Sequence, residues 1–148
     1  MSPLPFGASL ALALGALTML VSHCGEPLPA ADDPAARLPG TWLREYQVQD
    51  VKVRRVLRLE PGGAFQEAVR AVDGAGQVSE QAHEGTWLYD GTNLKRRYTL
   101  MNGKPPSRLN LPFATFEIRF ESRNDFTGVD HIHRNQVHYW RVPADTLP

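Results

Sequence analysis

Three charged residues, Arg55, Glu67 and Arg96, fall where an alternating strand pattern turns side chains toward the core. Each shares its parity with apolar neighbours: Arg55 with Leu57 and Leu59, Glu67 with Phe65 and Val69, and Arg96 with Leu94 and Tyr98. Alternate residues of a β-strand face the same side, so the three charges are predicted to point inward. An arginine offers a planar fork of N–H donors. The group therefore predicts a polar anchor for a ligand carboxylate or phosphate.

The same charges have a structural interpretation as well. If Pro61-Gly62-Gly63 forms a turn, Leu57 lies opposite Glu67 in the hairpin. Arg55 then lies opposite Val69, which makes Arg55 and Glu67 diagonal neighbours. A buried or rim ion pair would fix the strand register, and a bulge would turn one of the charges outward. The interior candidates for ligand binding are Arg55, Glu67, Arg96, Phe65, Tyr98 and Phe120.

A histidine-rich run near the end of the chain suggests a metal site, because His131 and His133 lie two residues apart on one strand face. A turn at 134–136 would place His138 on the other face of the hairpin from His133. A third ligand would then need a bulge, and no convergent carboxylate or second cysteine is present. An exposed polar hairpin is the favoured interpretation, with His131 and His133 as weak metal candidates.

The sequence has no nucleophile elbow, phosphate loop or zinc-protease motif, so it predicts neither an enzyme nor a cofactor. The 16 basic and 16 acidic residues give a formal net charge of zero. No bulk charge field therefore favours binding of nucleic acid or of an anionic membrane surface.

From Gly40 onward, apolar and polar residues alternate with a period of two. Turn-forming clusters such as Asp73-Gly74-Ala75-Gly76 and Asp90-Gly91 separate about eight such segments. The last two strands are predicted at 126–133 and 137–142. Consecutive antiparallel strands of this number predict an all-β up-and-down barrel, which leaves no exposed sheet edge. A β-sandwich is the main alternative.

The tripeptide Gly-Thr-Trp occurs at residues 40–42 and again at 85–87, and Tyr-Trp-Arg follows at 139–141. With these motifs, about residues 38–142 resemble a lipocalin-like (calycin-type) barrel of the small kind found in bacterial envelope lipoproteins. The resemblance implies a structural signature in which Arg141 packs across the ring of Trp42, after Gly40 has opened the first strand. Gly85 and Trp87 repeat the motif, and we interpret them as a second core anchor.

The chain begins with features of an exported protein. An apolar run over residues 7–21 predicts the core of a secretory signal at 1–24. The position of Cys24, the only cysteine, resembles a bacterial lipoprotein cleavage site, where the cysteine becomes the lipid-bearing first residue. Alternatively, the cysteine is lost with the leader of a soluble exported protein. Residues 25–38, rich in Pro and Ala, predict a flexible tether, and residues 39–148 predict the barrel domain.

The sequence thus predicts an exported periplasmic or cell-envelope barrel, held to the membrane by lipid at Cys24, that binds a small apolar or amphipathic ligand. Trp42 and Trp87 are expected to line or plug its interior. The alternative is a filled barrel that contacts an envelope protein partner as an interaction or structural module. An accessible cavity favours the first, and a solid core with an exposed apolar patch favours the second.

Overall fold

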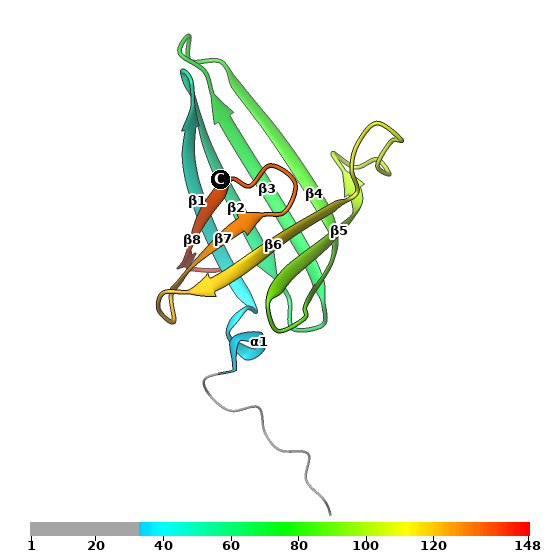
Figure 1. The fold of residues 1–148 in the computed structure, drawn as a ribbon. Helices are drawn as coiled ribbons and strands as arrows, with labels where there is room; N and C mark the ends of the chain where they lie inside the picture. Colours follow the sequence, from blue (N-terminus) through cyan, green and yellow to red (C-terminus); the bar gives the residue numbers. More distant parts are fainter. Residues whose placement is uncertain (1–32) are drawn as a thin grey trace, which may run out of the picture.

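The computed structural model describes residues 33–148, which form a short helix followed by eight strands (Figure 1). The predicted signal at 1–24, Cys24 and the first part of the predicted tether lie outside the described residues. The helix is α1 (Pro34–Arg37), and the strands are β1 (Gly40–Val48), β2 (Val51–Leu59), β3 (Ala64–Val72), β4 (Val78–Tyr89), β5 (Asn93–Met101), β6 (Phe113–Phe120), β7 (Asp125–Asp130) and β8 (Gln136–Val142).

The eight strands form a closed antiparallel barrel in the order β1 to β8, as the sequence predicts. Each strand pairs with the next, and β8 returns to β1 through Leu43↔Trp140 and two further pairs. Every connection is a hairpin because turn-forming residues separate the alternating segments. At the β4–β5 turn, for example, the Asp90 carboxylate accepts hydrogen bonds from the backbone N–H groups of Thr92 and Asn93.

One end of the barrel, which we call the closed end, is covered by α1 (Figure 1). The Asp33 carboxylate caps this helix by accepting a hydrogen bond from the backbone of Ala35, and Pro34 occupies the first turn. The next residue after the helix, Leu38, is completely buried in the core. The predicted flexible tether over 25–38 is therefore wrong for its last six residues. Asp33-Pro34 is a helix-start signal that the Pro- and Ala-rich composition obscured.

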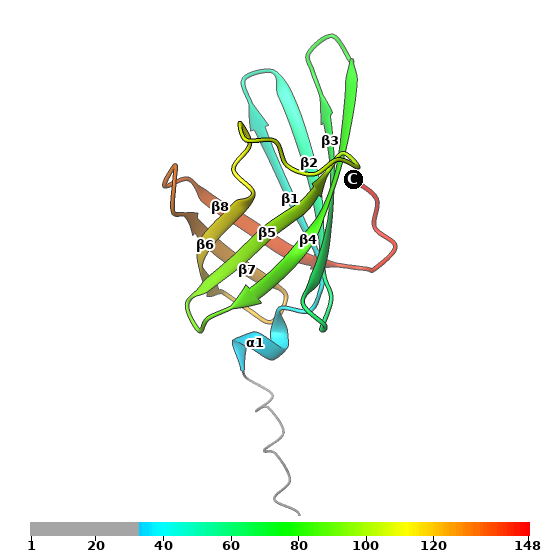
Figure 2. The same ribbon diagram turned by 90° about the vertical axis from the view of Figure 1, so that its right-hand side faces the viewer.

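The opposite end, which we call the open end, carries a four-stranded extension (Figure 2). It consists of residues 44–48 of β1, 51–55 of β2, 69–72 of β3 and 78–81 of β4. These residues pair with one another but not with β8 or β5, whose ladders begin nearer the barrel's middle. The β5–β6 loop and the β7–β8 loop also lie at this end (Figures 1 and 2).

Aromatic side chains fill the half of the barrel nearest α1. Trp42 is fully buried and contacts Phe126 edge-on, with 4.8 Å between ring centroids. Phe126 in turn stacks on Tyr139 at 5.2 Å. The Trp42 indole donates a hydrogen bond of 2.8 Å to the carbonyl of Leu38, so the first strand anchors the residue that closes the barrel.

Candidate ligand-binding site

The three charged residues singled out in the sequence meet inside the barrel. The Glu67 carboxylate is completely buried. It accepts from Arg96 Nη1 at 2.6 Å and pairs with Arg55 Nη1 at 3.0 Å. The Tyr98 hydroxyl donates to the same carboxylate across 3.2 Å. We call Arg55, Glu67, Arg96 and Tyr98 the ion cluster. The side chain of Arg55 is 22% exposed whereas that of Arg96 is 2% exposed, so Arg55 is the arginine that reaches toward solvent.

Strand register brings these residues together. In the β2–β3 ladder Leu57 lies opposite Glu67 and Arg55 opposite Val69, which confirms the predicted diagonal relation of Arg55 and Glu67. Arg96 and Tyr98 come from β5 and lie on the far side of β4 from Glu67. The inward parity of all three charges is confirmed as well.

Gly85 of β4 makes room for this arrangement. In the ladders it lies between Phe65 of β3 and Tyr98 of β5, next to an irregularity at Glu84 and Gly85. A Cβ atom there would meet the Arg97 carbonyl oxygen at 1.9 Å and Phe65 Cε1 at 2.7 Å. Because Gly85 has no side chain, Phe65 and Tyr98 approach each other over it, edge to face at 5.2 Å.

The ion cluster carries excess positive charge. Two guanidinium groups surround one carboxylate, which leaves the ion cluster with a net charge of +1. Burial alone would raise the pKa of Glu67, but the attraction of Arg96 and Arg55 outweighs it and lowers the pKa to about 2. Burial likewise opposes the charge on Arg55 and Arg96, yet attraction to Glu67 raises the pKa of both. All three groups are therefore ionised at neutral pH.

Several polar atoms around the ion cluster are buried without a hydrogen-bond partner. They are Nε of Arg55, Nε of Arg96, Nδ1 of His83 and the hydroxyl of Tyr139. Burial and the two arginines lower the pKa of His83, which keeps its imidazole neutral at neutral pH. Most buried polar groups in proteins are paired, so the unpaired guanidinium N–H groups and the unpaired Tyr139 hydroxyl beside excess positive charge favour an anionic ligand.

The inner face of the four-stranded extension continues from the ion cluster toward the open end. Tyr46 lies opposite Val53 and Val53 opposite Ala71, so all three share the face of Arg55. They are half-buried, whereas the core side chains in the half of the barrel nearest α1 are buried. Arg55 donates to the Tyr46 hydroxyl at 3.4 Å, which joins this face to the ion cluster. The face is not wholly apolar, because Arg44 lies opposite Arg55 and stacks over the Tyr46 ring at 4.2 Å.

The remaining interior candidates lie at different depths. Phe65 and Tyr98 are buried and take part in the site, and the guanidinium of Arg96 lies 5.5 Å from the Phe65 ring centroid. Phe120 is at the closed end, where Arg37 lies over its ring at 4.8 Å. The structure therefore does not bring Phe120 to the ion cluster. Three further residues near the ion cluster, His83, Tyr139 and Tyr46, are not among the predicted site residues, although each shares the inward parity of its strand.

The residues of the predicted structural signature pack as the resemblance implies. The Arg141 guanidinium lies 4.3 Å from the Trp42 ring centroid, and its Nη1 donates to the carbonyl of Pro39 at 3.0 Å. A Cβ atom on Gly40 would lie 2.2 Å from that Nη1. The second copy differs, because Gly85 lies inside β4 rather than at a strand start. Trp87 is half-buried, packs against the core and donates to the carbonyl of Glu60 at 2.9 Å.

The last hairpin is present as predicted, but the strand predicted at 126–133 ends three residues early, and a loop over 131–135 replaces the turn predicted at 134–136. β7 ends at Asp130 and β8 begins at Gln136. The Asp130 carboxylate accepts hydrogen bonds from the backbone N–H groups of Ile132 and His133, which bends the chain out of the strand early.

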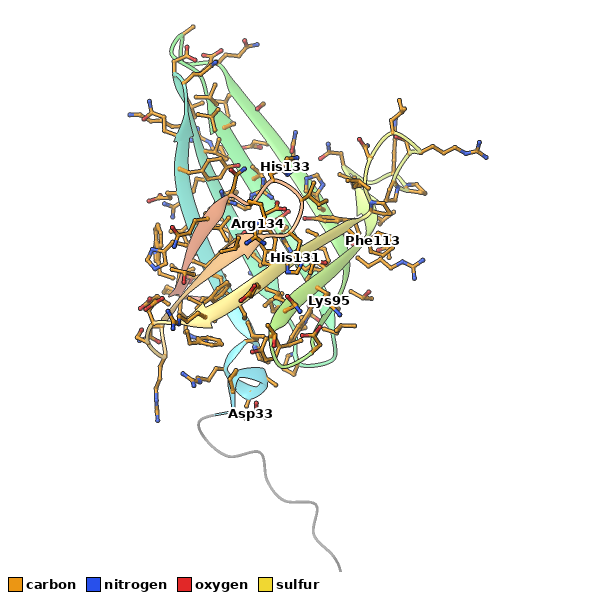
Figure 3. The ribbon with its side chains drawn as sticks, in the orientation of Figure 1. Asp33, Lys95, Phe113, His131, His133 and Arg134 are labelled. Atoms are coloured by element: carbon orange, nitrogen blue, oxygen red, sulfur yellow. The ribbon has the colours of Figure 1, made fainter. Side chains whose placement is uncertain are left out.

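The histidines of this region do not converge. Figure 3 shows His131 and His133 in the β7–β8 loop, and both are exposed. The ring of His131 contacts the Asn93 side chain at 2.9 Å, whereas His138 of β8 lies 3.4 Å from the Asp125 carboxylate. Within residues 33–148 no group of three potential ligands could hold a metal ion.

The closed ladder and the ion cluster define the class of protein as an all-β, up-and-down antiparallel barrel with a charged interior. The sequence matches no model of a protein family and no curated protein. Among solved structures it is similar to a de novo designed fluorescence-activating β-barrel, with 12% sequence identity and a TM-score of 0.42, over 74% of this chain and 98% of the designed one. At these values the similarity carries no inference about function. No helix among the described residues is long and apolar enough to cross a membrane.

Proposed function

We propose that this barrel binds a small amphipathic molecule with an anionic head, and that it acts as a binding protein rather than an enzyme. The head, a carboxylate or phosphate, would contact Arg55, and the apolar part would lie against the inner face of the extension. The observation that carries the proposal is the ion cluster, with its net charge of +1 and its unpaired buried donors. An anion there would gain charge-assisted hydrogen bonds in a setting largely removed from water.

Displacement of a fluorescent probe tests this function. We would titrate 1-anilinonaphthalene-8-sulfonate into the full chain, then compete with dodecanoate and with the uncharged dodecanol. Replacing Arg55 by Gln leaves the buried Glu67–Arg96 pair in place and lowers the net charge of the ion cluster from +1 to zero. We expect Arg55→Gln to weaken dodecanoate binding at least about tenfold, with dodecanol unchanged.

The matched control is Arg54→Gln. Arg54 is the neighbour of Arg55 on β2, points outward and pairs with Glu45. The Arg54→Gln variant therefore removes the same charge as Arg55→Gln, but from the outer face of β2. Equal losses in the two variants, or equal losses for dodecanoate and dodecanol in Arg55→Gln, would refute the anionic site.

A second candidate function rests on the half of the barrel nearest α1, which is filled by its own side chains. Trp42, Leu57, Leu59, Phe65 and Phe126 are each no more than 1% exposed. A barrel filled by its own side chains would serve the cell envelope as a protein-interaction or structural module, using its exterior. Failure of all probes to bind wild-type protein, together with cross-linking to one envelope protein, would favour this function over ligand binding.

We further propose that the protein is a lipocalin-like envelope lipoprotein, exported and anchored by lipid at Cys24. The contact of Arg141 with Trp42 and the apolar run before Cys24 support this proposal. The test is the denatured mass of protein purified from its own envelope. A mass that begins at Cys24 with added acyl chains supports the anchor, and an unmodified mass that begins after Cys24 contradicts it.

A further inference from the structure

The β5–β6 region concentrates positive charge that the chain as a whole does not have. Residues 91–116 contain five Lys and Arg residues and no Asp or Glu. Two of these cations are neutralised elsewhere, since Arg96 pairs with Glu67 and Lys95 with Asp90. The other three, Arg97, Lys104 and Arg108, make no ion pair among the described residues.

Large apolar side chains are exposed at the same place. Leu109 is 95% exposed, Leu111 is 65% exposed, and Phe113 at the start of β6 is 56% exposed. Figure 1 shows the loop between β5 and β6 projecting from the barrel wall at the open end. Exposed apolar residues gathered on a projecting loop indicate a contact surface rather than a failure to reach the core.

The loop is held in shape by its own backbone bonds. The N–H of Tyr98 donates to the carbonyl of Pro112 at 2.7 Å, and the N–H of Asn110 donates to the carbonyl of Ser107 at 3.1 Å. Pro105 and Pro106 restrict the backbone further. Because the loop is ordered before any contact, little conformational entropy would be lost when Leu109 and Leu111 are covered.

Cationic and apolar side chains share one groove of about 660 Å³ on this surface. Arg97 of β5 and Arg108 of the loop line it together with Leu109, Leu111 and Phe113. Guanidinium groups bind phosphate through paired N–H donors, and neighbouring leucines provide an apolar surface for acyl chains. We call these five residues the loop surface.

We propose that the loop surface docks on a bilayer that carries anionic lipid headgroups. Arg97 and Arg108 would contact headgroup phosphates while Leu109 and Leu111 enter the acyl boundary, which is the arrangement of an interfacial membrane anchor. The unpaired cations are complementary in charge to anionic headgroups. The two leucines lie on a projecting loop, so they can enter a bilayer without the barrel wall approaching it. Docking in this way would turn the open end of the barrel toward the membrane. The proposal does not depend on the ligand or on lipid at Cys24.

Co-sedimentation of the full chain with vesicles tests it. Phosphatidylcholine vesicles with and without phosphatidylglycerol would be compared at low and high salt. The apolar run at 7–21 contributes equally to every variant, so the readout is the gain in association caused by phosphatidylglycerol. We expect Arg97→Gln/Arg108→Gln to reduce association with anionic vesicles about 25-fold at low salt. We expect Leu109→Ser/Leu111→Ser to reduce it about tenfold.

The control is Lys52→Gln/Arg119→Gln. It removes two exposed cations, neither in an ion pair among the described residues, from other parts of the barrel exterior. Association of this variant should match wild type within about twofold. Equal losses in the control and in Arg97→Gln/Arg108→Gln would overturn the proposal. An absence of any effect of phosphatidylglycerol on association would also overturn the proposal. Binding to poly-L-glutamate without association with vesicles would instead assign the surface to an acidic protein partner.

Discussion

Arg96 and Glu67 form a buried ion pair of 2.6 Å between β5 and β3, two strands that do not pair with each other. The bond therefore crosses the inside of the barrel and ties the wall on either side of β4. With Arg55 contacting the same carboxylate, Glu67 balances one buried and one half-buried arginine. This arrangement makes the ion cluster important to stability as well as to the proposed binding.

Removing the charge of Glu67 should destabilise the barrel strongly. In Glu67→Gln both guanidinium groups would remain without a counter-charge, one of them fully buried, which costs about 3–5 kcal/mol in comparable cases. The measurement is the free energy of unfolding in urea at neutral pH. Glu45→Gln provides the control, because its pair with Arg54 is exposed and should contribute less than about 1 kcal/mol. Similar losses in the two variants would show that the ion cluster does not carry the effect.

Stability should also depend on pH through Glu67. Its pKa is lowered from an ordinary value of 4.5 to about 2, because the two arginines outweigh the effect of burial. A lowered pKa in the folded state means that the stabilisation is complete above about pH 4.5 and is lost as the pH falls toward about 2. Urea unfolding at a series of pH values should show the difference between wild type and Glu67→Gln shrinking across this window. A constant difference would contradict the linkage.

Much of this site is predictable from the sequence, because parity in a regular hairpin places residues reliably. The turn at 61–63 has no bulge, so the opposition of Leu57 to Glu67 follows from counting. The cross-barrel pair of Arg96 with Glu67 does not follow in this way. Parity predicts that both face inward, but the distance between them depends on barrel closure and on the irregularity at Gly85.

Other parts could not be predicted for local reasons. The early end of β7 depends on the Asp130 carboxylate capturing backbone N–H groups, which competes with strand pairing. Residues 33–38 have a defined structure because the Leu38 side chain is buried in the core. Amino-acid composition does not reveal such a tertiary contact. The resemblance implied the stacking of Arg141 on Trp42, but it did not indicate the ion cluster.

Gly85 should be intolerant of a side chain. In Gly85→Ala the new Cβ would lie 1.9 Å from the Arg97 carbonyl oxygen, a backbone atom that cannot move without distorting β5. We expect a loss of about 3 kcal/mol in the free energy of unfolding, because overpacking at a rigid contact forces the backbone to shift.

Gly62→Ala is the matched control for that experiment. A Cβ atom at Gly62 has nothing within 4 Å, and its backbone lies outside the left-handed region. The control should remain within about 0.5 kcal/mol of wild type. A loss in Gly85→Ala no larger than in Gly62→Ala would show that β4 relaxes at its irregularity and that the close approach of Phe65 and Tyr98 is not required.

Arg141→Lys should loosen the closed end of the barrel. Arg141 stacks on Trp42 and also donates to the carbonyls of Arg37 and Pro39, a set of contacts that requires a planar fork. An ammonium group can keep only part of this set, so we expect a loss of about 1–2 kcal/mol in the free energy of unfolding. The backbone N–H of Leu38, the C-cap residue of α1, donates to the carbonyl of Pro34. The rate of hydrogen exchange at this N–H should rise in Arg141→Lys. Arg119→Lys, on the exposed face of β6, should change neither quantity. Unchanged exchange at Leu38 in Arg141→Lys would show that the buried Leu38 side chain holds the closed end without Arg141.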